Sequence, residues 1–442
     1  MIKKISDFLL KEINPLPLDI FRLIFGFVLC YQFYYYISID YIHQFITGPQ
    51  ILFKYPLLEF LQAGSERTLT IILYLMFFLS ALIALGIKTR WASILLFPCF
   101  FYFTFIDQTL YNNHLYLFLI IIGLFSFIIN DKSLTISSII KKEKNHNERI
   151  PNWSLFLLQF IIFCTYFFGG IAKLNADWIS CDLPKLLLSS KIEHPSKVLI
   201  YFISYGGLLF DLSIGLLLWY KRTFFIALFA VFFFNIMNGL FLFDDIGVFP
   251  LFMVGATVLF IPQTIFARFT SEKKLPDFTR DTTNPIKKNN LALGLSLVFI
   301  VFNLLFPLRH YLFTPHPEWT GLGAKFSWRM KMQSNSTEHI KLMIRDEASD
   351  VIHPIEYESF LTANQKIHFL DDPMYVVQLA HFLHQEGTKR GMVNPVITGD
   401  IRVSMNGRPS QPMVYTDIDL ATVPIDRWEI AKIVQPLVVK QK

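Results

Sequence analysis

Lys173 stands directly after a long uncharged stretch of the chain. Residues 154–171 carry no charged side chain, and Gly169 and Gly170 precede the lysine in the sequence Gly-Gly-Ile-Ala-Lys-Leu-Asn-Ala-Asp-Trp, which ends at Trp178. A lysine at the end of an apolar helix commonly extends to the membrane surface as an anchor. An amine that apolar walls partly desolvate instead loses proton affinity, and its neutral form can act as a general base. The residue itself leaves both interpretations open.

The neighbours of Lys173 and other polar side chains bear on this choice. The two glycines would let another helix or a flat ligand approach the backbone closely. Further polar residues lie at the ends of apolar stretches, where they are costly and therefore candidates for function, although a lone histidine there is also commonly a hydrogen-bonded interface residue. The candidates are Asn113, His114, Asn235, Asn238 and His310, the last of which also has the ordinary interpretation of a surface histidine.

The composition is that of a membrane protein. Of 442 residues 53% are hydrophobic, 47 are Phe, and the mean hydropathy is +0.44, which is too apolar for a soluble chain of this size. A helix needs about 20 apolar residues to cross a bilayer. Nine segments qualify: 19–39, 68–86, 92–106, 113–130, 154–172, 197–219, 224–240, 248–262 and 289–306. The segments 92–106 and 248–262 are marginal and could be re-entrant.

Basic residues are distributed unevenly between the loops that join these segments. With the N-terminus inside, 18 Lys and Arg residues fall in the inside loops and 5 in the outside loops. This bias follows the positive-inside rule. It predicts an integral membrane protein with a cytoplasmic N-terminus and with everything after about residue 307 outside. Lys173 and the other candidates then all lie near the outer face, so we expect one shared site there.

Charge and cysteine usage exclude other classes. The net charge of +6 arises entirely within residues 1–306, and no Lys/Arg run is interleaved with aromatic residues, so no nucleic-acid partner is expected. The four cysteines show no spacing typical of a zinc site or a disulfide framework, so no metal is expected. The chain also lacks the common nucleotide-binding, metalloprotease and hydrolase motifs.

Residues 307–442 are predicted to form a separate extracytoplasmic α+β domain, which follows a transmembrane domain of residues 1–306. The expected elements are a strand over 326–332, a hairpin of 341–345 and 351–357, a helix over 373–385 that ends at Gly387, and a hairpin turned by Asn406-Gly407.

Two charges lie inside predicted spans. Helical rise places Arg22 about 5 Å and Asp211 about 12 Å from the inner face. An arginine could reach that far, so a pair between the two is a weaker hypothesis.

Several motifs, taken together in their order and spacing, resemble the vitamin K-dependent γ-glutamyl carboxylase family, whose membrane part is also called the HTTM domain. In the membrane part they are Pro17–Arg22 with Phe25-Gly26, Asn112–Leu117, Lys173–Trp178, Gly206–Ser213 and Met237-Asn238. Beyond it they are His310, Trp319-Thr320, Phe326–Trp328 and Val434–Leu437. The pieces extend over most of the chain, which we expect to be a short bacterial homologue, in the plasma or inner membrane.

The resemblance implies an enzyme, a carboxylase of the carbon–carbon lyase class, that uses reduced vitamin K (a naphthohydroquinone), O2 and CO2. It implies that Lys173 deprotonates the hydroquinone and that O2 addition then gives the epoxide and a strong base. That base takes the γ proton of a glutamyl side chain, and the carbanion captures CO2. By the same resemblance His114 supports the site, His310 has a proposed role, and Trp319, Ser327 and Trp328 fall where the family holds its glutamyl substrate.

The chain also departs from the animal members of this family. Asn235 stands where a histidine is expected, Ala324 replaces an aromatic residue, the cysteine pair that joins the two halves is not recognisable, and the chain stops soon after Pro436. Quinol oxygenation is therefore better supported than carboxylation of a glutamyl protein or peptide. The alternatives are a quinol epoxidase that does not carboxylate and a non-catalytic membrane protein that binds a quinone or lipid.

Overall fold

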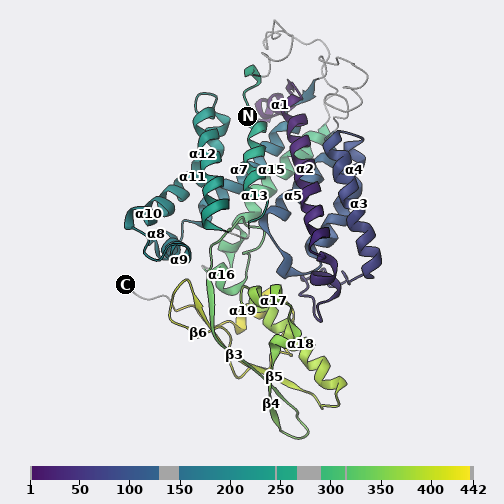
Figure 1. Ribbon diagram of the computed structural model, residues 1–442, viewed down its shortest axis with the longest axis vertical. Helices are drawn as coiled ribbons and strands as arrows, with labels where there is room; N and C mark the ends of the chain where they lie inside the picture. The colour runs from purple at the N-terminus through teal and green to yellow at the C-terminus, as the bar shows by residue number, and fades with distance from the viewer. Residues whose placement is uncertain (1, 129–148, 244–245, 266–289, 314–315, 439–442) are drawn as a thin grey trace.

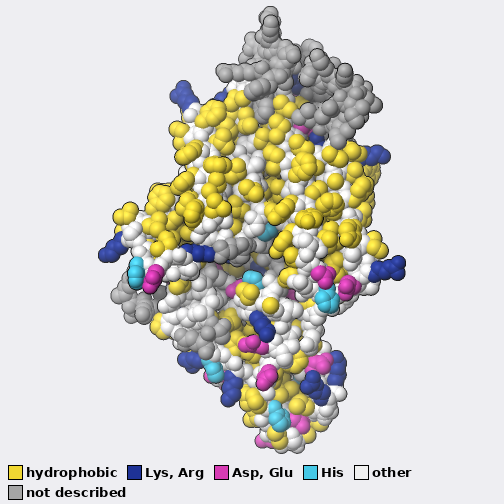
Figure 2. Space-filling model, viewed as in Figure 1, with side chains coloured by type: hydrophobic (Ala, Val, Ile, Leu, Met, Phe, Trp, Pro, Cys, Tyr) yellow, Lys and Arg dark blue, Asp and Glu magenta, His cyan; other side chains and the backbone are white. Residues whose placement is uncertain are grey.

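A computed structural model describes residues 2–128, 149–243, 246–265, 290–313 and 316–438 of the chain. The described residues form a helical part and a part that contains a β-sheet, which follow one another along the longest axis of the molecule (Figure 1). Hydrophobic side chains cover the visible face of the helical part, and most of the charged side chains on that face lie at its edges or on the sheet-containing part (Figure 2). Such an apolar belt suits a lipid environment.

Helices occupy all nine segments that the hydropathy indicated. They are α2 (Leu16–Ser38), α3 (Glu66–Leu85), α4 (Thr89–Phe105), α5 (Asn113–Phe127), α7 (Trp153–Ala172), α10 (Lys197–Tyr201) with η3 (Phe202–Gly206) and α11 (Gly207–Trp219), α12 (Phe224–Met237) with η4 (Asn238–Leu242), α13 (Phe249–Ala256) with η5 (Thr257–Phe260), and α15 (Asn290–Leu305) with η6 (Phe306–Leu312). Among the described residues, six of these stretches are long and apolar enough to cross a membrane, whereas α4, with 17 residues, α5 and the α13–η5 stretch are shorter. The membrane class is confirmed, but the count of nine spans is not.

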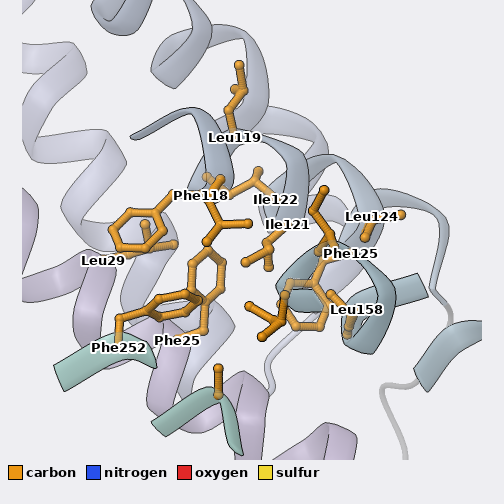
Figure 3. Packing of buried hydrophobic residues seen from close by; sticks show 14 of the residues in the cluster. Phe25, Leu29, Phe118, Leu119, Ile121, Ile122, Leu124, Phe125, Leu158 and Phe252 are labelled. Atoms are coloured by element: carbon orange, nitrogen blue, oxygen red, sulfur yellow. The ribbon is translucent and has the colours of Figure 1, made fainter. Parts of the chain in front are cut away.

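Packed phenylalanine rings form the centre of the helical part. The ring of Phe25 in α2 contacts Phe118 of α5 and Phe252 of α13, with centroids 5.5 and 5.8 Å apart (Figure 3). Phe118 and Phe252 contact each other edge-on at 4.9 Å. Each such pair adds about 0.5–1.5 kcal/mol beyond the burial of its surface. These contacts fix three helices that are distant in sequence against one another.

Glycines bring α7 and α11 close together. A Cβ atom added to Gly170 would lie 2.8 Å from the backbone nitrogen of Leu212, and one added to Gly215 would lie 2.6 Å from the ring of Phe163. Only small residues permit such an approach of two helix backbones. The contact sets the register in which Asp211 of α11 faces the end of α7.

Two π-helical turns adjoin α11 and α12: η3 directly precedes α11, and η4 directly follows α12. The π-helix is rare and often marks a functional site because it displaces side chains from the regular helical positions. Both turns border the cavity described below.

The sheet-containing part is a four-stranded antiparallel sheet of order β4-β3-β5-β6 against which helices pack. Its elements are β3 (Asn335–Arg345), β4 (Ile352–Ile355), η7 (Tyr357–Phe360), α17 (Ala363–His368), α18 (Pro373–Lys389), β5 (Val396–Met405), β6 (Gln411–Pro412) and α19 (Arg427–Ile433). The first predicted hairpin is confirmed as β3–β4. The second is confirmed as β5–β6, with positive φ angles of 54° and 72° at Asn406 and Gly407.

Two predictions for this part are wrong. Helix α18 does not end at Gly387 but continues to Lys389, because Gly387 packs on Ile344 inside the helix and the left-handed glycine is Gly391. Residues 326–332 form no strand. Phe326, Trp328 and Lys331 all have positive φ, so the alternating pattern of large side chains reflects a contorted loop.

The remaining short elements connect these parts. They are α1 (Ile2–Leu10), β1 (Glu12–Ile13), which pairs with β2 (Ile150–Pro151), η1 (His43–Thr47), η2 (Gln108–Leu110), α8 (Ala176–Ile179), α9 (Asp182–Ser189) and α16 (Pro317–Thr320). The two parts meet where Lys54, from a loop of the helical part, and Gln108, from η2, form hydrogen bonds with Gln378 and Arg427, respectively.

Candidate active site

An apolar cavity of about 270 Å³ opens among α7, η3, α11, α12, η4 and α13. Phenylalanine rings make up much of its wall, from Phe202, Phe210, Phe233, Phe234, Phe243 and Phe249. The polar residues in the wall are few, and the two charged groups that face each other there are Lys173 and Asp211. Small-molecule sites typically combine apolar walls of this kind with a few placed polar groups.

Lys173 and Asp211 form a buried ion pair in this wall. The Lys173 Nζ donates to Asp211 Oδ2 at 2.5 Å. The ammonium also lies 4.9 Å from the ring centroid of Trp178 and 5.7 Å from that of Phe234. The side chains of the pair are only 11% and 7% exposed. The lysine therefore points into the protein and is not an anchor at the membrane surface.

Local capping explains why the lysine lies there. Lys173 is the residue at which α7 ends, and Asn175 immediately accepts a hydrogen bond from Trp178 to start α8. The indole of Trp178 donates to the Ser204 carbonyl, and the Ser204 hydroxyl donates back to the Trp178 carbonyl, both at 2.8 Å. This reciprocal pair ties the turn after Lys173 to η3.

The loop of residues 326–331 closes one side of the cavity. Met330 and Lys331 line it, and the Trp328 carbonyl and the Met330 side chain pack against Gly169, where an added Cβ would lie at ordinary van der Waals distances of 3.8 and 3.5 Å from them. Left-handed backbone at three non-glycine residues costs of order 1–3 kcal/mol each and persists only where the surroundings enforce it. The extramembrane chain thus contributes directly to the cavity wall.

A second ion pair joins the Lys173 segment to the sheet-containing part. Arg408 donates to both oxygens of Asp177, and Asn406 donates to Asp177 Oδ2 at 2.7 Å. Burial alone would raise the pKa of the Asp177 carboxyl, but these hydrogen bonds and the charge of Arg408 outweigh it and hold the pKa below its usual value. The carboxylate is therefore ionised and paired at neutral pH.

The structure brings several of the predicted site residues to the cavity. Asn235 and Asn238 line it together with Lys173. The Asn235 amide donates to the Val231 carbonyl at 2.8 Å and to the Tyr166 hydroxyl at 3.3 Å. His114 does not line the cavity; its buried ring stacks behind Phe249, which does. Asn113 accepts from Tyr111, whose hydroxyl in turn accepts from the backbone of Phe326.

The other predicted residues lie outside the cavity. His310 is buried, and its Nε2 faces Arg329 at 3.2 Å. Because arginine only donates, Nε2 must accept, so the proton sits on Nδ1 and is donated to the Pro307 carbonyl at 2.9 Å. Trp319 and Trp328 are fully buried, Trp319 donates to the Gln435 carbonyl, and Ser327 accepts from Arg309.

Asp211 was not predicted as a site residue. Its position as an acid within an apolar span was the available signal. The suggested pair with Arg22 is wrong: the Arg22 guanidinium donates to the carbonyls of Ile83 and Ala84 and lies 3.9 Å from Asp19. Among the residues that the structure describes, no group of three or more His, Cys, Asp or Glu side chains could hold a metal ion.

The fold and the cavity define an integral membrane protein that carries an amine–carboxylate pair beside an extramembrane domain. The family model of the HTTM domain matches residues 10–264, and that of the vitamin K-dependent gamma-carboxylase lumenal domain matches residues 288–440. The chain belongs to the vitamin K-dependent γ-carboxylase family, as the motifs indicated. No solved structure matches it. The second match starts ahead of α15, and the domain boundary at residues 306/307 stays a prediction.

Proposed function

We propose that the chain epoxidises a reduced naphthoquinone in this cavity, with Lys173 as the residue that starts the reaction, and that it uses the resulting base to carboxylate a glutamyl side chain. The observation that carries the proposal is the buried Lys173–Asp211 pair in the wall of an otherwise apolar, aromatic cavity. The apolar, aromatic walls suit a hydrophobic, ring-shaped ligand. The ion pair provides a group that can accept a proton from that ligand.

The cavity fits such a ligand in size and chemistry. Its volume of about 270 Å³ is just below the roughly 300–1,000 Å³ typical of small-molecule sites. Both amide hydrogens of Asn235 are engaged by Val231 and Tyr166, so its Oδ1 is the atom left to accept a ligand hydroxyl. The exposed Phe202 lies at the cavity margin, which favours access from the bilayer.

Each element of the site then has a task. The Lys173–Asp211 pair takes up a hydroquinone proton, the aromatic walls exclude water, and the 326–331 loop separates the cavity from the extramembrane side. When bound, the reduced naphthoquinone supplies, with O2, the oxidation that yields its epoxide and a base strong enough to remove a glutamyl γ proton. CO2 is the co-substrate of that second step, and no metal takes part in the proposed scheme.

The remaining predicted residues keep secondary roles in the proposal. His114 supports the cavity wall through Phe249, and His310 holds Arg329 of the 326–331 loop. Trp319, Ser327 and Trp328 shape the extramembrane side on which a glutamyl protein or peptide would bind. The N-terminus is cytoplasmic and the site lies at the outer face, in the inner or plasma membrane of a bacterial host.

The test is epoxide formation by purified protein supplied with reduced vitamin K and O2. Wild-type protein should form epoxide, and Lys173→Ala should not, whereas Lys185→Ala, an exposed lysine of the same outer segment, should be unaffected. Labelled CO2 and a short glutamyl peptide then separate carboxylation from epoxidation alone. Tight quinone binding without epoxide in the wild type would favour a non-catalytic quinone-binding protein instead.

A further inference from the structure

Lys173 is held as an ammonium ion before any ligand arrives. Its Nζ lies 2.5 Å from Asp211 Oδ2, shorter than the roughly 2.7–2.9 Å of an ordinary charge-assisted N–H···O bond, so the amine and the carboxylate are directly paired. An ammonium group has three hydrogens to donate and no lone pair to accept a proton. A lysine in this state cannot by itself take a proton from a hydroquinone. Within this ion pair, the lone pairs that can accept a proton are on the carboxylate oxygens of Asp211.

We infer that Asp211 and Lys173 act as one proton-accepting unit, in which Asp211 supplies the accepting oxygen and Lys173 supplies the positive charge. The inference rests on the proposed function and adds a second residue to it. In the step, a phenolic O–H bond breaks and an O–H bond forms on the carboxylate of Asp211. The net charge of the pair rises from 0 to +1, and the phenolic oxygen keeps the electron pair and one negative charge. No electron is transferred and no further reactant is needed.

The surroundings support a neutral resting pair. An isolated charge in an apolar wall is costly, whereas a paired lysine and aspartate carry no net charge. Within the part of the chain that the structure describes, the other titratable groups in the cavity wall are Tyr166, from α7, and Lys331, from the 326–331 loop. The Trp178 and Phe234 rings face the ammonium and stabilise its positive charge throughout the step.

Glycines border the ion pair, at ordinary van der Waals distances for Gly207 and Gly169 and at a much closer helix contact for Gly170. Gly207 lies where a Cβ would come within 3.8 Å of Lys173 Nζ, and Gly169 lies where one would come within 3.4 Å of Asp211 Oδ2. Gly170 lets α11 approach α7 so that the two groups meet. Three glycines thus surround one ion pair in the cavity wall.

The first test is made without turnover. Purified protein is mixed under nitrogen with a short-chain naphthohydroquinone, and the absorbance of the ionised hydroquinone is recorded. Wild type should show the ionised form. Asp211→Asn should show at least about tenfold less while still quenching its tryptophan fluorescence on quinone binding, as the wild type does. Asp182→Asn, which removes an exposed carboxylate of α9 outside the cavity wall, is the control and should behave as wild type.

The second test is kinetic. In air, Asp211→Asn should lower kcat for epoxide formation by about 100-fold, within the range that general-base catalysis contributes, with KM changed no more than about threefold. Asp211→Glu keeps the carboxylate and should recover part of the ionised-hydroquinone absorbance and part of kcat. It replaces Asp211→Asn if that variant does not fold. Wild-type ionisation and kcat in Asp211→Asn, or no ionised form in the wild type, overturns the inference. An active Lys173→Ala overturns the proposed function instead.

Discussion

The guanidinium of Arg408 holds the carboxylate of Asp177 through hydrogen bonds of 2.5 and 2.8 Å, although 231 residues separate the two in sequence. Asp177 lies four positions after Lys173, and Arg408 follows the Asn406-Gly407 turn of the extramembrane sheet. The segment that carries the proposed base is therefore held on one side by Ser204 and on the other by the sheet.

Loss of this link should loosen the segment around Lys173. We predict that Arg408→Ala lowers kcat for epoxide formation by about tenfold or more, because small displacements of a catalytic group are costly. Arg408→Lys should recover only part, since lysine cannot pair bidentately. Arg402→Ala removes an exposed arginine of β5, the strand that precedes this turn, and serves as control. Unchanged kcat in Arg408→Ala would show that the link does not position the site.

Because of the buried Asp372, the stability of the fold should depend on pH in the acid range. Burial alone would raise the pKa of its carboxyl, but Arg427 and Lys325 outweigh burial and hold the pKa below its usual value of about 3.9. A lowered folded-state pKa stabilises the fold above that usual value, and this stability is lost as pH falls further. Asp372→Asn also removes the carboxylate that pairs with two partly buried cations, at a cost of about 3–5 kcal/mol.

The measurement is thermal unfolding in detergent for wild type and Asp372→Asn. The gap between their Tm values should be constant above about pH 5 and narrow below about pH 4. Asp350→Asn, an exposed acid in the β3–β4 turn, should show no comparable gap. A gap that does not change down to pH 3 would contradict the assignment of this stability to the Asp372 carboxylate.

Gly170 should tolerate no side chain. A Cβ there would meet Leu212 at 2.8 Å, so Gly170→Ala should overpack the α7–α11 contact by about 1–3 kcal/mol and separate Asp211 from Lys173. Gly294 in α15 provides the matched control, because an added Cβ meets nothing within 4 Å. Gly294→Ala should be neutral or stabilising by up to about 1 kcal/mol. Equal Tm changes in both variants would mean that the close contact is unimportant.

The structural features that the sequence predicted correctly are those that depend on local sequence pattern. Long apolar stretches located the helices because a bilayer demands them, and Asn406-Gly407 located a hairpin because that turn requires two positive φ angles. The loop at 326–332 was mistaken for a strand because Phe326, Trp328 and Met330 alternate. In the structure these residues make separate contacts with Tyr116, Gly169 and the cavity. An alternating sequence pattern does not reveal such contacts.

The part of the site that depends on local sequence pattern was predicted as well. Lys173, Asn235 and Asn238 meet at one cavity, as their common position at the outer ends of helices suggested. Asp211 could not be assigned to Lys173, because their meeting depends on the register of α7 against α11. That register is set by Gly170 and Gly215, whose neighbours lie about 40–50 positions away in sequence. His310 and the two tryptophans lie elsewhere, and their roles stay predictions.

The most direct test of the central claim is epoxide formation from reduced vitamin K and O2 by purified wild-type and Lys173→Ala protein, both shown to be folded and to bind quinone. The account predicts epoxide from the wild type and none above background from Lys173→Ala, with Lys185→Ala as active as the wild type. Epoxide at the wild-type rate from Lys173→Ala would remove the lysine from the mechanism and contradict the account.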